Sequence, residues 1–173
     1  MFASATGMLG PMAGLRWGRT VLAGLAATWV MDRVDKLVYL AQPAWVHRRE
    51  AELEDLTGPG QLARVLMRAA GHEPTHDEAV AGGRFLHLTM GACCAIAYVA
   101  GLREIPSLRA GFGAGYGLAI LPANLVVVPA LGLTPPATAF PRETTIRGAI
   151  YHIGYGVALE ACVRLLRLDA PRG

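Results

Sequence analysis

The stretch Phe85-Leu-His-Leu-Thr-Met-Gly-Ala-Cys-Cys-Ala-Ile-Ala-Tyr-Val-Ala-Gly-Leu102 decides the fold of this chain. Apart from His87, the stretch contains no Asp, Glu, Lys, Arg or His. An uninterrupted apolar run of this length is typical of a helix that crosses the hydrocarbon core of a bilayer. The sequence therefore predicts a membrane-spanning helix over residues 85–102.

The composition of the whole chain agrees with a membrane protein. Its 173 residues are 53% apolar and 17% charged, whereas a soluble domain carries about 25% charged residues. The charges are also segregated, since none falls between 110 and 134. The net charge of +3 comes from scattered basic residues with no interleaved aromatic platform, so we expect no nucleic-acid partner.

Further apolar segments on either side of 85–102 complete the predicted architecture. We expect an all-α, polytopic membrane protein forming one domain over 1–173, with four transmembrane helices at about 17–40, 85–102, 108–131 and 146–166. The polar loop 42–83 should be solvated at His47–Glu50. Its segment 61–70 has an apolar side and an arginine side, which predicts a short amphipathic helix on the membrane surface.

The first predicted span carries charges near its end. In one interpretation the helix emerges into the interface at Asp32, and in the other Asp32 stays inside the bundle and faces Lys36. The first interpretation is favoured. An even number of spans places both termini on one side, and the short basic loops favour the cytoplasmic side for them.

Small residues in the third predicted span favour close helix packing. Gly111, Gly113, Gly115 and Gly117 supply two overlapping GxxxG spacings. Pro122 should kink the helix beyond them. We expect the same packing role for Gly91 and Gly156, each of which follows a histidine by four positions.

A few polar residues inside the apolar segments form the candidate functional site. Ionisable groups are costly in a bilayer and therefore mark functional positions. His87 and His152 are predicted at similar depth, toward the membrane face that bears the long loop. One stripe on the last helix joins His152, Gly156, Glu160 and Arg164. The full candidate set is Asp32, His87, Asn124, His152, Glu160 and Arg164.

Three roles are open for the two histidines. Each ring could hydrogen-bond a neighbouring helix and fix its packing. Together with Glu160 they could instead form a path for protons, ions or a small solute. They could also ligate a haem between helices. The first role is favoured, so the sequence predicts no cofactor.

Other motifs favour structural roles. His72-Glu73-Pro74-Thr75-His76 matches the HExxH zinc-protease pattern, but Pro74 would break the required helix. Thr75 and Glu78 instead form a capping box that begins the second span. Cys93, Cys94 and Cys162 lie in apolar segments and read as small hydrophobic residues. No nucleophile and base stand at usable spacing, so we expect no enzyme.

The order of these features resembles a known family. Ala27 to Asp32, His87 with Gly91 and Tyr98, a glycine-rich third helix, Gly132 to Pro136, and His152 to Gly156 follow one another as in the YagU-like family of small bacterial inner-membrane proteins. The resemblance covers roughly 20–166. It implies a multi-pass protein of the bacterial inner membrane, and it implies no reaction, cofactor or site residue.

The sequence thus predicts a non-catalytic inner-membrane component. It would act through its lipid-embedded surface or its 42–83 loop on a partner, on a second copy or within a larger membrane complex, with the third helix as the contact. The alternatives are a small transporter and, less favoured, a haem protein. Residues 1–17 lack the pattern of a cleaved signal peptide, so we expect the chain to stay in the membrane.

Overall fold

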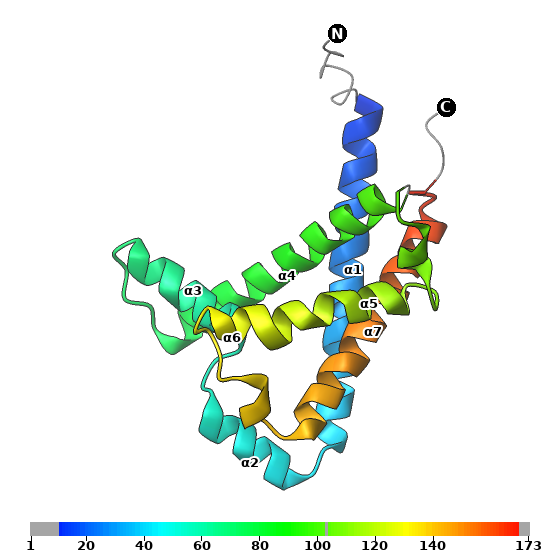
Figure 1. Ribbon diagram of the computed structural model, residues 1–173. Helices are drawn as coiled ribbons and strands as arrows, with labels where there is room; N and C mark the ends of the chain where they lie inside the picture. The colour runs from blue at the N-terminus through cyan, green and yellow to red at the C-terminus, as the bar shows by residue number, and fades with distance from the viewer. Residues whose placement is uncertain (1–10, 103, 170–173) are drawn as a thin grey trace.

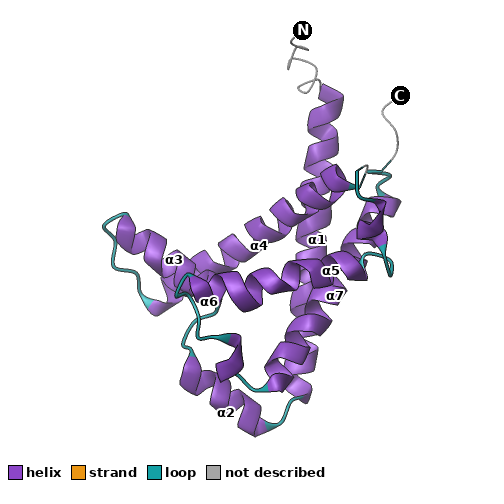
Figure 2. Ribbon diagram, in the orientation of Figure 1, coloured by secondary structure: helices purple, strands orange, loops and turns teal. Residues whose placement is uncertain are grey.

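The apolar segments fold into helices, and the computed structural model shows no strand in the part of the chain that it describes, 11–102 and 104–169 (Figures 1 and 2). The predicted all-α fold is confirmed. The expectation about the N-terminus falls largely on 1–10, outside the described residues. The elements are α1 (Pro11–Ala41), α2 (Ala44–Leu53), α3 (Gly58–Ala69), α4 (His76–Gly101), the 3₁₀ helix η2 (Pro106–Arg109), α5 (Ala114–Pro122), the π-helical η3 (Ala123–Val127), α6 (Val128–Ala130), the 3₁₀ helix η4 (Ala137–Ala139) and α7 (Arg142–Leu165).

The fold is built on two antiparallel helices, α1 and α7, on which the other two long helical segments pack. α1 and α7 lie side by side and run in opposite directions, α4 packs on α1, and α5 packs on α7 (Figure 1). α4 and the α5–α6 run lean away from this pair toward α3, which covers the beginning of α4. The shared core is small and includes Ala23, Ala27, Ala95, Tyr98 and Leu159.

One helix of the described residues, α4, is both long and apolar enough to cross a membrane by itself. The other described helices do not meet both requirements. α1 and α7 carry charges along their length, and the continuous apolar run Ala114–Ala130 is short. Length and composition alone therefore identify one candidate span rather than four.

The start of the third predicted span was placed wrongly. The helix begins at Ala114 and not at Leu108, because Gly111 and Gly113 adopt positive φ angles of 59° and 85° that a right-handed helix excludes. Leu108 lies instead in the 3₁₀ turn η2. After Pro122 the chain continues as the π-helical segment η3, which accommodates the helix backbone beyond the proline.

The 42–83 segment is more ordered than predicted. His47–Glu50 was expected to be solvated, yet it lies in α2, where the Glu50 side chain is 12% exposed beside Arg147. The prediction is wrong for Glu50, because sequence spacing could not reveal its partner on α7, whereas Arg48 and Arg49 are exposed as predicted. The amphipathic helix exists as α3, but it packs on α4 through Gly60 and Ala63, and Leu66 stays half exposed.

The predicted capping box is confirmed at the start of α4. The Thr75 hydroxyl accepts from the Glu78 backbone N–H, and the Glu78 carboxylate accepts from the Thr75 N–H at 2.8 Å. His72 remains outside the helix, 3.3 Å from the same carboxylate. The two histidines of the HExxH pattern therefore do not share one helix turn.

The capping box predicts a pH-dependent start of α4. Hydrogen bonds from the Thr75 backbone, the Thr75 hydroxyl and His72 lower the pKa of Glu78 from 4.5. A carboxyl whose folded pKa is depressed stabilises the fold above its unfolded pKa, and this contribution is lost as the pH falls through the folded pKa. We expect protection of the Thr75 amide against hydrogen exchange to fall below about pH 4. Glu78→Gln should remove that pH dependence, and unchanged protection in the native protein down to pH 2 would contradict it.

Candidate functional site

Glu160 is the most enclosed charged group among the described residues. Its side chain is fully buried on α7, and Gly113 and Gly156 beside it let α5 approach closely. The Tyr98 hydroxyl donates to Oε2 at 2.8 Å, and Arg164 Nε donates to Oε1 at 2.6 Å. Both carboxylate oxygens are therefore paired, as a buried charge requires.

A second arginine joins this network from η2. Arg109 Nε lies 3.6 Å from Glu160 Oε1, and its Nη2 donates to Asp169 at 2.7 Å. The hydrogen bond from Arg109 lowers the pKa of Asp169, which keeps that carboxyl ionised. Neither Arg109 nor Asp169 was a predicted site residue, since Arg109 reaches Glu160 only through the turn before α5 and Asp169 contacts Arg109.

His87 and Asp32 form a pair between α4 and α1. His87 Nε2 and Asp32 Oδ1 are 3.1 Å apart, and the two side chains are 31% and 48% exposed. Asp32 therefore points at a neighbouring helix and not at Lys36, its own i+4 residue. The pair lies within the first turn of the apolar stretch of α4, close to the charged end of α1.

His152 is buried and bonded within its own helix. Its Nδ1 lies 2.7 Å from the Gly148 carbonyl oxygen, so Nδ1 carries the proton. Among the described residues, the hydrogen bonds of His87 and His152 go to different partners. Glu160 follows His152 by two helix turns, about 12 Å along α7. The structure thus places the three predicted residues in separate environments.

Asn124 lies in the π-helical segment and is exposed. Its Nδ2 is 3.4 Å from the Tyr151 hydroxyl, a long hydrogen bond. This contact joins η3 to α7, at the end of the molecule where Arg147 stands. Asn124 therefore belongs with neither the Glu160 network nor the His87–Asp32 pair.

Glycines decide where the helices touch. A β-carbon at Gly117 would overlap the His152 carbonyl oxygen, and one at Gly156 would overlap the Gly113 carbonyl oxygen. A β-carbon at Gly91 would overlap the Thr28 hydroxyl on α1. We call the contact of Gly113 and Gly117 with α7 the glycine seam.

Two predicted packing glycines take no part in the seam. The nearest atoms to a β-carbon at Gly115 belong to Ala110, and the nearest to one at Gly111 belongs to Ala114. Both neighbours are local in sequence. Within the chain, Gly111 and Gly115 therefore do not bring two helices together, because the helix begins later than the GxxxG spacing suggested.

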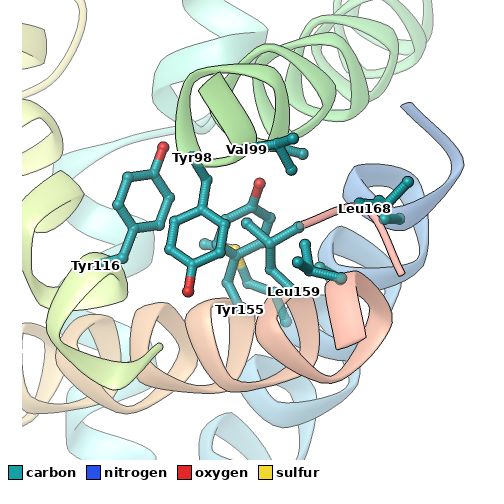
Figure 3. Close-up of a cluster of buried hydrophobic side chains, with 11 residues drawn as sticks. Tyr98, Val99, Tyr116, Tyr155, Leu159 and Leu168 are labelled. Atoms are coloured by element: carbon teal, nitrogen blue, oxygen red, sulfur yellow. The ribbon is translucent and has the colours of Figure 1, made fainter. Parts of the chain in front are cut away.

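Hydrogen bonds from tyrosine hydroxyls connect the helices at the buried centre. These tyrosines were not among the predicted site residues. Figure 3 shows Tyr98, Tyr116 and Tyr155 gathered where α4, α5 and α7 meet. The Tyr116 hydroxyl donates to the Cys94 carbonyl at 2.6 Å, and the Tyr155 hydroxyl donates to the Gly91 carbonyl at 2.6 Å. A tyrosine inside an apolar stretch needs such a partner, and that signal could have identified them.

The opposite end of α7 carries another network. Arg147 is mostly buried, lies 3.1 Å from Asp35 on α1 and 3.1 Å from Glu50 on α2, and also donates to Gln42. The Thr144 hydroxyl donates to Glu50. Arg147 thus joins three elements at one end, as Arg109 and Arg164 gather around Glu160 at the other.

The described residues hold no group of three or more His, Cys, Asp or Glu side chains that could bind a metal ion. The arrangement can fix helices against one another through paired charges and close backbone contacts. No family model, curated protein or solved structure was found to match this chain.

Proposed function

We propose that this chain is a non-catalytic integral membrane protein whose four long helical segments, α1, α4, the α5–α6 run and α7, all cross the bilayer. It would be an accessory component of the bacterial inner membrane, as the resemblance to the YagU-like family implies. Its partners would be the lipid bilayer and either a second copy or another membrane protein.

The observation that carries this proposal is the number of large apolar side chains left exposed on helices that bury a few polar ones. Thr20, Thr28, His152 and Glu160 are buried. Large apolar side chains are exposed along all four segments, whereas soluble proteins bury most side chains of this kind. They include Leu22, Trp29, Phe85, Leu88, Met90, Leu118, Val126, Val127, Ile150, Val157 and Leu165.

The ends of the helices support the same placement. About 25 Å of helix separates Arg147 from Arg164 on α7, close to the thickness of a hydrocarbon core. In the second half of α1, near the charged run that begins at Asp32, the exposed Trp29 lies under the Arg33 guanidinium, 5.2 Å from ring centre to Cζ. Tryptophan beside arginine is typical of a membrane–water interface.

The packing supports a structural role over a conducting one. A path through His152 and Glu160 would need water along the stripe that joins them, but the glycine seam brings α5 backbone against that stripe. Both Glu160 oxygens are also engaged. Since the seam glycines face α7, a partner would meet the opposite, apolar side of the α5–α6 run.

Cys93 provides a direct test of the membrane proposal. The structure leaves this thiol exposed in the middle of α4. The test uses a variant that keeps Cys93 and replaces Cys94 and Cys162 by alanine. We expect a water-soluble maleimide to leave Cys93 unlabelled in intact vesicles and to label it after SDS has unfolded the protein. Rapid labelling in vesicles would overturn the proposal, because it would show that Cys93 faces water and not lipid.

A matched control uses the turn that follows α4. Ser107 is exposed in η2, beyond the apolar stretch. Ser107→Cys in a background without the native cysteines should react in opened vesicles as fast as a free thiol. The contrast between the two positions separates protection by lipid from slow chemistry.

A further inference from the structure

A hollow of about 450 Å³ lies between the end of α2 and the loop that follows α6. One wall is formed by 51–55 and by Gln61 at the start of α3, and the opposite wall is formed by 132–135. None of these lining residues belongs to the four long helical segments. Three carboxylates line the space, Glu52, Glu54 and Asp55, and we call it the acidic hollow.

Glu54 differs from the other two carboxylates because no arginine is paired with it among the described residues. Glu52 pairs with Arg49 at 3.2 Å, and Asp55 pairs with Arg64 at 2.6 Å. Glu54 Oε2 is buried and accepts no hydrogen bond from any described residue. Burying a charge without a partner is costly. The acidic hollow therefore holds a negative charge that the described side chains leave unpaired.

Arg147 is near Glu54 but is already engaged by other carboxylates. It pairs with Asp35 and with Glu50, each at 3.1 Å. Burial and then the charge of Glu50 raise the pKa of Glu54, and the opposing effect of Arg147 is smaller. A cation bound beside Glu54 would oppose both effects and keep the carboxylate ionised.

The loop wall of the acidic hollow offers acceptors and few donors. The N–H groups of Gly132 and Leu133 donate to carbonyl oxygens of α6. Pro135 has no N–H group. A ligand that enters the acidic hollow must therefore bring its own hydrogen-bond donors. A primary ammonium group brings three of them together with a positive charge.

The composition and size of the acidic hollow favour an organic ammonium over a metal ion. Calcium and magnesium ions require several oxygen ligands in a fixed arrangement, and the described part of the chain brings no three acidic, His or Cys side chains together for this. The volume falls within the about 300–1,000 Å³ of small-molecule sites. We propose that the acidic hollow binds the ammonium group of an aliphatic polyamine beside Glu54. Binding at this position would not depend on which helices cross the membrane.

Substitution of Glu54 gives the main test, with spermidine as the probe. Glu54→Gln removes the charge and keeps the shape, so it should weaken spermidine binding by about tenfold or more. Isothermal titration calorimetry of the full chain in a neutral detergent measures the dissociation constant. Because burial penalises the charged form, this variant should fold at least as well as the native protein. Unchanged affinity in the variant, or no binding of millimolar spermidine by the native protein, would overturn the site.

Glu52→Gln is the matched control. It makes the same chemical change in the same hollow, but the Glu52 side chain is 63% exposed and paired with Arg49. Its loss should leave the spermidine affinity within about twofold of the native value, since exposed charges are screened by water. Equal losses in Glu52→Gln and Glu54→Gln would overturn the site, because net charge alone would then explain the binding.

Competition with magnesium tests the class of ligand. A metal ion would find few oxygen ligands beside Glu54, so magnesium at the concentration of spermidine should displace little of it. Full displacement would overturn the assignment to an organic ammonium. The labelling of Cys93 reports on the membrane placement alone, so failure of that proposal and failure of this site are read separately.

Discussion

The substitution Gly117→Ala is expected to lower sharply the fraction of the protein that is folded. The added methyl group would overlap the His152 carbonyl oxygen and approach the carbonyl carbon and Ile153 Cα, all of which are backbone atoms of α7. Backbone in a helix cannot turn aside as a side chain can, so the glycine seam must open. Overpacking typically costs about 1–3 kcal/mol, and contact with backbone belongs at or above the upper end of that range. The midpoint of SDS-induced unfolding measures the change.

Gly18→Ala is the matched control for this substitution. Gly18 lies in α1, and nothing stands within 4 Å of its would-be β-carbon. Replacing an unhindered helical glycine by alanine should stabilise the protein by up to about 1 kcal/mol. The same chemical change is thus expected to act in opposite directions at two positions. Equal effects at both would show that helix propensity and not the seam decides the result.

Local patterns in the sequence predicted the local structure. Long apolar runs predicted an all-α chain, and Thr75 with Glu78 predicted where α4 begins. The four-residue steps from His152 to Glu160 predicted one helix face, and that face lies against α5. Each of these depends on residues within one or two helix turns, so spacing alone is enough.

Contacts between distant segments could not be predicted in this way. The GxxxG spacing identified the right kind of residue, but the positive φ angles of Gly111 and Gly113 moved the helix start and changed which glycines meet α7. Helix rotation likewise decided that His87 meets Asp32 rather than His152. Arg109 reaches Glu160 because it lies in the 3₁₀ turn η2, a region that the sequence analysis had placed in the third predicted span.

Glu160→Ala should produce the second large loss of stability. The substitution removes the acceptor of the buried Tyr98 hydroxyl and the shared anion of Arg109 and Arg164. Breaking a buried ion pair costs about 3–5 kcal/mol. We expect the lower end, because Arg164 is 52% exposed and can be rehydrated. Glu160→Gln keeps an acceptor for Tyr98 and should cost about 1–2 kcal/mol, measured by the same SDS-induced unfolding.

An exposed ion pair on α2 supplies the comparison. Arg49 and Glu52 are 3.2 Å apart with side chains 49% and 63% exposed, so Glu52→Ala should change stability by no more than about 0.5 kcal/mol. The order Glu160→Ala, Glu160→Gln, Glu52→Ala follows from burial and from the number of partners left without an acceptor. If Glu160→Ala were as mild as Glu52→Ala, the network would not hold α4, η2 and α7 together. The role of Glu160 would then be something other than stabilising the packing of these helices.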